Sequence, residues 1–325
     1  MKMKNLLIFF RITVFGLLLL LTVSGCQQKD KSVPSIGYVQ IIEDATLDEA
    51  KRGFFDALKE SGFEDGKTLH VDYQNAQGDM VLLSQILDKF IQGKVDLIAA
   101  NTTVATIAAA QKTKEIPVCM MVAPRPDIAK LTKEDGTIPP NLCGTYETLA
   151  YIDTSVVLIK QVFPNARRVG TVFNFAEPNS VNARNRLKAT CDSLGLELVE
   201  ASVASSNETQ QVASSVIAKN VDVFFALPDN IIFASFETVY KLASDKKIPI
   251  ISSEMGLVRR GAFIAYGADF YEWGKQAGNS AARVLKGEKN VTPDEVKIRK
   301  RVYNEATAKA LNLTIPAGFE KIKPL

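Results

Sequence analysis

The most constraining feature of this sequence is a regular alternation of short apolar runs with longer amphipathic segments, repeated about every 30 residues from Ser35 onward. The run SIGYVQII has strand character, and the segment at 47–63 places apolar residues at a helical period up to Gly62. The run VDLIAA, at 95–100, is almost wholly apolar, as expected for a strand covered by helices on both faces. This alternation predicts an α/β fold with doubly wound parallel sheets.

The pattern restarts in the second half of the chain, after a proline-rich stretch at 123–141. The phrases KVDLIAAN and KEIPVCMMV of the first half correspond to NVDVFFALPD and KKIPIISSE of the second, which predicts two similar Rossmann-like lobes joined by hinge strands. We assign 35–146 and 268–290 to the first lobe and 147–267 and 291–325 to the second, with crossings near 143–148, 266–269 and 289–293. A cleft between the lobes, at the carboxyl ends of the strands, is the expected ligand site.

The first 25 residues have the layout of an export signal, with basic residues ahead of and within an apolar stretch. The stretch ends in Val23-Ser24-Gly25-Cys26, which resembles a bacterial lipobox and predicts cleavage before Cys26 and lipid attachment to its thiol. Residues 26–34 then form a polar tether. A cleaved form without lipid and an uncleaved membrane anchor are the alternatives.

Composition excludes several classes of function. The 39 Lys and Arg against 36 Asp and Glu leave a net charge of +3, too weak for a nucleic-acid binder, and a single histidine, His70, excludes a His-rich metal site. The sequence has no G-x-S-x-G, Walker A, G-x-G-x-x-G or H-E-x-x-H motif, so no catalytic residue, metal or cofactor is indicated. Cys119, Cys143 and Cys191 are expected to be buried thiols, with a disulfide between Cys119 and Cys143 as the alternative.

Polar side chains follow the predicted strands at the ends that face the expected cleft. Thr102 and Thr103 open a helix whose N–H groups suit a carboxylate, although plain N-capping by Asn101 or Thr102 explains this loop equally well. In the second lobe Asp229 and Glu254 suit an ammonium group, and Asn179 suits either end of a zwitterion. Aromatic residues near these loops offer rings for stacking or hinge packing, namely Phe175, Phe233, Tyr266, Phe270, Tyr271 and Trp273.

Several segments resemble the ABC-transporter substrate-binding lipoproteins of the tryptophan/tyrosine-binding type, which have the type I periplasmic-binding-protein fold. The phrases DYQNAQGDM, at 72–80, and YGADFYEWG, at 266–274, are the most specific, and the resemblance spans essentially the whole chain after Cys26. Carried over by position, it implies ligand contacts from Gln40, Thr102, Thr103, Asn179, Ser180, Asp229, Asn230 and Asp269, and the loops themselves add Glu254.

The resemblance implies an extracytoplasmic, lipid-anchored solute-binding protein of an ABC importer. Such a protein closes its lobes on a small zwitterionic ligand, here an amino acid with aromatic ones favoured, and delivers it to a permease driven by an ATPase. It is a monomer, has no cofactor and is not an enzyme. A receptor lipoprotein that signals to a membrane sensor would have the same sequence features, and an envelope hydrolase on this fold is a further alternative.

One departure from the resemblance concerns the cleft wall. Relatives carry an acidic residue after the fourth strand, whereas this chain has Ala123-Pro124-Arg125-Pro126. We therefore expect Arg125 to bring a cation to that wall.

Overall fold

Two β-sheets with the same core strand order organise the chain. The structure, a computed structural model, describes residues 33–323, and from Pro34 onward these form one compact unit. The predicted export signal, Cys26 and most of the predicted tether lie outside the described residues.

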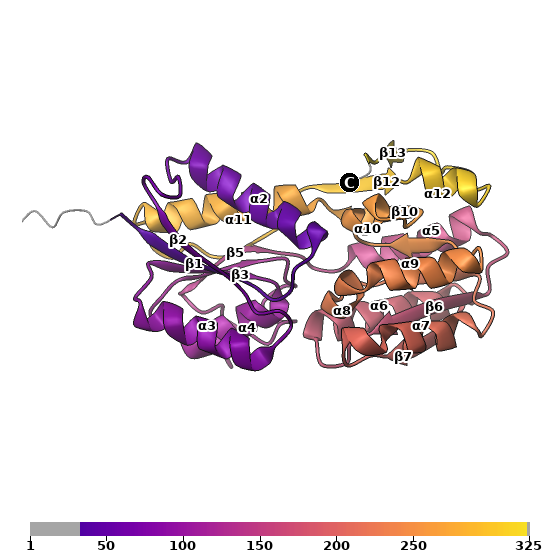
Figure 1. Ribbon diagram of the computed structural model, residues 1–325, viewed down its shortest axis with the longest axis horizontal. Coiled ribbons are helices and arrows are strands. Elements are labelled where there is room, and N and C mark those ends of the chain that lie inside the picture. Colours follow the sequence, from indigo (N-terminus) through magenta and orange to yellow (C-terminus); the bar gives the residue numbers. More distant parts are fainter. Residues whose placement is uncertain (1–32, 324–325) are drawn as a thin grey trace, which may run out of the picture. The chain divides into compact units, whose positions relative to one another are not determined.

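The first sheet has the strand order β2-β1-β3-β4-β5-β11, with all strands parallel. Figure 1 shows α2 and α11 on one side of this sheet and α3 and α4 on the other. We call these elements the first lobe: β1 (Ser35–Gln40), α2 (Ala45–Glu60), β2 (His70–Asn75), α3 (Met80–Gln92), β3 (Leu97–Asn101), α4 (Thr103–Lys112), β4 (Val118–Met121), β5 (Leu142–Tyr146), α11 (Phe270–Leu285) and β11 (Asp294–Glu295).

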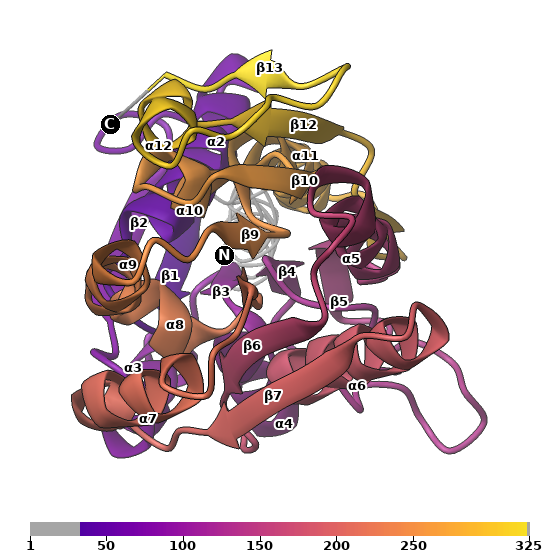
Figure 2. The ribbon, with the colours of Figure 1, turned by 90° about the vertical axis from the view of Figure 1, so that its right-hand side faces the viewer.

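The second sheet has the order β7-β6-β8-β9-β10-β12-β13, in which only the pairing of β10 with β12 is antiparallel. Figure 2 shows α7 and α9 on one side of it and α5 and α6 on the other. The second lobe comprises α5 (Tyr151–Val162), β6 (Arg168–Phe173), α6 (Pro178–Ser193), β7 (Glu197–Ser202), a 3-10 turn (Ser206–Glu208), α7 (Thr209–Ile217), β8 (Val223–Ala226), α8 (Asn230–Ala234), α9 (Phe236–Asp245), β9 (Ile250–Ser252), α10 (Met255–Arg259), β10 (Ile264–Ala268), β12 (Arg299–Tyr303), α12 (Glu305–Ala310) and β13 (Glu320–Lys321).

The predicted fold class is confirmed, because both lobes are doubly wound sheets with the order 2-1-3-4-5 in their parallel strands. Alternate residues along β1 point to opposite faces of the first sheet. Ile36 and Tyr38 pack with α2 and α11, whereas Val39 packs with α3 and α4. The buried runs of the sequence are thus explained by helices on both sides of each sheet.

A close contact between α2 and α11 fixes the start of α11 near the second lobe. A Cβ atom at Gly53 of α2 would lie 2.0 Å from the Tyr271 carbonyl oxygen, and one at Gly274 of α11 would lie 1.8 Å from the Ala50 carbonyl oxygen. Only glycine permits this approach of two backbones. The packing holds the first turn of α11, with Phe270 and Trp273, at the end of the sheet where the chain crosses between lobes.

The chain passes between the sheets three times. The first two passages, at 147–150 and at Asp269, lie at or beside the predicted positions. The third prediction was wrong: β11 pairs with β5, so Asp294 and Glu295 belong to the first sheet and the passage lies at 296–298 instead of 289–293. The backbone N–H of Val296 extends this pairing by donating to the Tyr146 carbonyl at 2.8 Å.

Candidate functional site

A cavity lies where the carboxyl ends of the strands of both lobes meet. It contains about 330 Å³ of space free of protein atoms, and part of this space is open to solvent. Both lobes line it, through Thr102, Thr103, Val122, Ala123, Pro124, Leu149, Tyr151, Asn179, Pro228, Asn230, Phe233, Glu254, Phe270 and Trp273. The site therefore sits at the strand ends where doubly wound sheets bind ligands.

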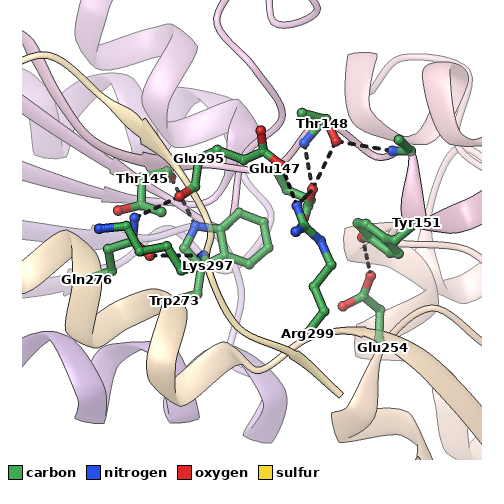
Figure 3. A network of polar contacts seen from close by, with 11 residues as sticks. Thr145, Glu147, Thr148, Tyr151, Glu254, Trp273, Gln276, Glu295, Lys297 and Arg299 are labelled. Atoms are coloured by element: carbon green, nitrogen blue, oxygen red, sulfur yellow. Dashed lines mark hydrogen bonds and ion pairs between the residues drawn. The ribbon is translucent and has the colours of Figure 1, made fainter. Parts of the chain in front are cut away.

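Glu254 is the one carboxyl group among these lining residues, and it is fully buried. Its Oε1 accepts hydrogen bonds from the Tyr151 hydroxyl at 2.8 Å and the Ser253 hydroxyl at 3.1 Å. Its Oε2 has no hydrogen-bond partner in the part of the chain that the structure describes. Figure 3 shows Oε1 facing Tyr151 and the second oxygen without a contact. A buried acceptor left open in this way is costly unless a ligand donates to it.

Asn179 presents a second open acceptor from the first turn of α6. Its side-chain nitrogen donates to the Pro228 carbonyl at 2.8 Å and to Glu177 Oε2 at 3.3 Å. The Pro228 carbonyl can only accept, so it fixes which end of the amide is oxygen. That oxygen is buried and finds no partner among the described residues.

Glu177 holds this side of the cavity together. Its Oε2 also accepts from the side-chain and backbone nitrogens of Asn230, at 2.8 and 3.3 Å. Burial, followed by the nearby charge of Asp229, raises the pKa of Glu177 to about 7. Because Glu177 binds both Asn179 and Asn230 and does not line the cavity, it acts on the site by positioning these two amides.

Hydrogen-bond donors lie on the side of the cavity formed by the first lobe. Thr102 and Thr103 stand at the start of α4, and the Thr102 side chain does not cap the helix. It donates instead across the lobes to Asn230 Oδ1 at 3.1 Å. The first N–H groups of α4 therefore lack a side-chain acceptor, while the helix dipole favours a negative charge there. The predicted N-capping is not formed, because Thr102 bonds Asn230 and the side-chain oxygen of Asn101 has no partner among the described residues.

Four aromatic side chains complete the cavity. Phe233 and Phe270 make an edge-on contact at a centroid distance of 6.2 Å, and Phe270 and Trp273 another at 5.6 Å. The Trp273 indole nitrogen donates to the Thr145 carbonyl at 2.9 Å, which fixes the ring as drawn in Figure 3. Tyr151, at the start of α5, is the fourth aromatic residue of the lining. Rings held this rigidly suit a flat, apolar part of a ligand.

An ion pair braces the hinge beside this wall. Glu147, in the first passage between sheets, is fully buried and accepts from Arg299 of β12 through Nε at 2.9 Å and Nη2 at 2.6 Å. Arg299 also contacts Glu295 of β11 at 2.7 Å. One guanidinium thus joins the first and third passages, as Figure 3 shows.

A second buried ion pair joins the lobes directly. Arg260, which follows α10, donates through Nη1 to Asp44 Oδ2 at 2.6 Å, and their side chains are 8% and 2% exposed. Asp44 uses its other oxygen to cap α2 through the N–H groups of Thr46 and Leu47. A neighbouring pair, Arg259 with Glu49 at 3.2 Å, is more exposed.

Five of the nine residues predicted to contact ligand line the cavity: Thr102, Thr103, Asn179, Asn230 and Glu254. The other four do not line it, because their polar groups serve local structure. Gln40 bonds Ile42 and Asp48, and Ser180 bonds Asp229. Asp229 caps α8 and Asp269 caps α11.

Other expectations about the wall also need correction. Arg125 does not line the cavity; its exposed side chain pairs with Asp127. Of the aromatic candidates, Phe175 is 62% exposed, and neither it, Tyr266 nor Tyr271 reaches the cavity. Tyr151 was not among the predicted site residues. Its position just after the predicted crossing at 143–148 was the one sign in the sequence that it could reach the cleft.

The remaining predictions concern cysteines and metals. Cys119, Cys143 and Cys191 are buried free thiols, so the disulfide alternative is not realised in the described chain. Residues 33–323 contain no cluster of metal-ligating side chains. Within the same range no helix combines the length and apolarity that a membrane crossing requires.

Comparison with known proteins agrees with the fold. The chain is 36% identical to a tyrosine-binding protein of Clostridioides difficile over 331 aligned positions, covering 96% of this chain and 93% of that protein. A Streptococcus structure described as an ABC domain in complex with L-Trp is 27% identical with a TM-score of 0.82, covering 89% of this chain and 99% of the other.

A third comparison bears on conformation. The ligand-free, open structure of a substrate-binding protein with adhesive properties from Clostridium difficile is 33% identical, covering 90% of this chain and 100% of the other. Its TM-score is only 0.66, although it is closer in sequence than the L-Trp complex. Over the whole chain this structure therefore matches the L-Trp complex more closely than the open form.

The sequence pattern of one family matches residues 35–322, and therefore both lobes. The family is described as ABC transporter substrate binding protein, a class that binds solutes outside the cytoplasm. This match confirms the resemblance found in the sequence. The chain belongs to the family of ABC transporter substrate-binding proteins.

Proposed function

We propose that this protein captures an aromatic L-amino acid between its lobes and delivers it to an ABC importer. The observation that carries the proposal is the distribution of open polar groups around one cavity. The second lobe supplies two hydrogen-bond acceptors without a partner, one on Glu254 and one on Asn179. The first lobe supplies donors, the free N–H groups at the uncapped start of α4. An amino-acid zwitterion has the matching ammonium and carboxylate groups.

The aromatic wall supports an aromatic side chain. Phe233, Phe270, Trp273 and Tyr151 would enclose a ring between them, and burial of a large apolar group contributes roughly 1.5–3 kcal/mol. Similarity to a tyrosine-binding protein and to a protein solved with L-Trp points in the same direction. The interlobe contacts at Thr102 and Arg260 support capture by closure.

The test is a titration of the purified protein with the twenty amino acids, followed by calorimetry. We expect saturable binding of L-tyrosine or L-tryptophan. Tyramine or tryptamine, which lack the carboxylate, and the corresponding arylpropionates, which lack the ammonium group, should bind at least about 100-fold more weakly, because each leaves buried polar groups of the site unpaired. Equal affinity for the amino acid and its deaminated analogue would refute the assignment of Glu254.

We further propose that the protein acts as a monomer without a cofactor and without catalytic turnover, held to the membrane by lipid on Cys26. The lipobox at 23–26 supports the anchor. A Cys26→Ser variant should lose the lipid mass and leave the membrane fraction while binding its ligand unchanged. Cross-linking of the ligand-loaded wild type should recover a permease and its ATPase; recovery of a membrane sensor instead would favour a receptor role.

A further inference from the structure

Glu254 stands alone as an ionisable acid in the cavity. Among the lining residues only Glu254 and Tyr151 can ionise, and none is Lys, Arg or His. The Tyr151 hydroxyl is engaged with Glu254 Oε1 and brings no positive charge. A fully buried carboxylate without a cationic neighbour is strongly disfavoured, so the empty closed cavity favours the protonated acid.

Charged residues outside the cavity lining do not reverse this preference of Glu254 for its protonated form. Burial raises the pKa of Glu254 to about 8, while hydrogen bonds from Tyr151 and Ser253 oppose the rise and the charge of Glu147 adds to it. Glu147 is itself paired with Arg299, so that guanidinium is already committed to another carboxylate. On the remaining elements around the cavity, α4, α6, α8 and α11, the lining side chains are threonine, asparagine or aromatic.

We propose that ligand capture expels one proton from Glu254, so that the protein exchanges this proton for the ammonium group of its ligand. The inference rests on the proposed function and names a property of the same site. The free protein carries the proton on Glu254, the ligand enters as a zwitterion, and the proton leaves to solvent. In the complex the ionised Oε2 accepts from the ammonium group, whose positive charge replaces the lost proton.

The exchange has a quantitative signature. With a pKa of about 8 in the ligand-free cavity with the lobes together, Glu254 is protonated in about nine molecules of ten at pH 7 in that state, so ligand entry releases about 0.9 proton. The association constant should rise about ninefold between pH 6 and pH 7 and level off above about pH 8. A ligand that met an already ionised carboxylate would show neither effect.

The experiment is calorimetry of the full protein with L-tyrosine, and in parallel with L-tryptophan, at pH 7 in buffers of different ionisation enthalpy. A plot of the observed binding enthalpy against the ionisation enthalpy of the buffer has a slope equal to the number of protons released per ligand bound. We expect a slope near one proton in the wild type. Glu254→Gln, measured at higher protein concentration, should show no release.

Tyr151→Phe supplies a variant that keeps the acid. Because the Tyr151 hydroxyl stabilises the ionised form of Glu254, its loss should move the rise in affinity to higher pH without abolishing it. Binding with a zero slope in the wild type would overturn the proposal while leaving the amino-acid function intact. A slope that persists in Glu254→Gln would likewise overturn it. Failure of the wild type to bind any amino acid would instead refute the proposed function.

Discussion

The buried pair Arg260–Asp44 should act on lobe closure more than on folding. It connects the end of α10 in the second lobe with the start of α2 in the first, at 2.6 Å, with side chains only 8% and 2% exposed. We consider Arg260→Met, which keeps most of the apolar stem and removes the charge. It also removes two contacts within the second lobe, with the exposed Glu237 at 2.7 Å and with the Phe233 carbonyl at 2.8 Å. In the closed protein this leaves Asp44 buried without its partner, whereas separation of the lobes returns Asp44 to water.

The size of the effect follows from burial. Removal of one partner from a buried ion pair costs about 3–5 kcal/mol. The unliganded protein can avoid most of this cost by opening, because Asp44 then returns to water. The penalty therefore falls on the closed, ligand-bound state. At about 1.4 kcal/mol per factor of ten, the lower figure weakens binding on the order of 100-fold. Arg259→Met is the matched control, because its pair with Glu49 has side chains 27% and 22% exposed and is worth at most about 1 kcal/mol, or about fivefold.

Calorimetry with L-tyrosine and L-tryptophan gives the affinity, and small-angle scattering without ligand reports whether the lobes separate. Urea unfolding separates closure from fold stability. Asp44→Asn keeps the Oδ1 that caps α2, so Arg260→Met/Asp44→Asn should recover much of the lost affinity. The reasoning is refuted if Arg260→Met binds as well as Arg259→Met, or if it loses stability in urea while its affinity and scattering stay unchanged.

Three further outcomes are expected. Arg299→Met leaves the fully buried Glu147 without its cationic partner, so the free energy of unfolding in urea should fall by about 3–5 kcal/mol. A loss below about 1 kcal/mol would show that this ion pair does not stabilise the hinge. Gly256→Ala would place a Cβ atom 2.2 Å from Thr46 Oγ1 across the lobes, so calorimetry should show at least about tenfold weaker binding with little change in urea stability. The free energy of unfolding without ligand should fall from pH 5 to pH 8, since the folded state holds a proton on Glu254 up to about pH 8 and the unfolded state releases it near pH 4.5. The loss over this range is about 3–4 kcal/mol, and a Glu254→Gln variant with the same slope would count against it.

The fold could be predicted because its signal is carried by apolar periodicity. The strands of both lobes are buried runs between amphipathic helices, and the repeated phrases gave the correspondence of the lobes. The third passage could not be predicted, because β11 consists of two exposed acidic residues, Asp294 and Glu295. Backbone pairing with β5 places them in the first sheet, and such pairing cannot be recognised from the hydropathy of the sequence.

The site could be predicted only in part, for a different reason. An aspartate before a helix suits an N-cap as well as a ligand contact, and Asp229 and Asp269 are both caps. Glu254 and Asn179 stand at equally ordinary positions, and only three-dimensional contacts reveal that each keeps one oxygen without a partner among the described residues. The sequence therefore predicts the loops that can hold a site but not which of their polar atoms stay open.

The two lobes share one strand order yet contribute opposite polarity to the cavity. In the first lobe the loop after β3 offers donors, the N–H groups at the uncapped start of α4. In the second, the loop after β9 and the start of α6 offer acceptors, Glu254 and Asn179. A zwitterion satisfies both sides only when the lobes meet, so neither half of the site binds fully in the open protein. The polarity of the ligand itself then supplies the differential affinity that favours closure, as any ligand-driven change of state requires.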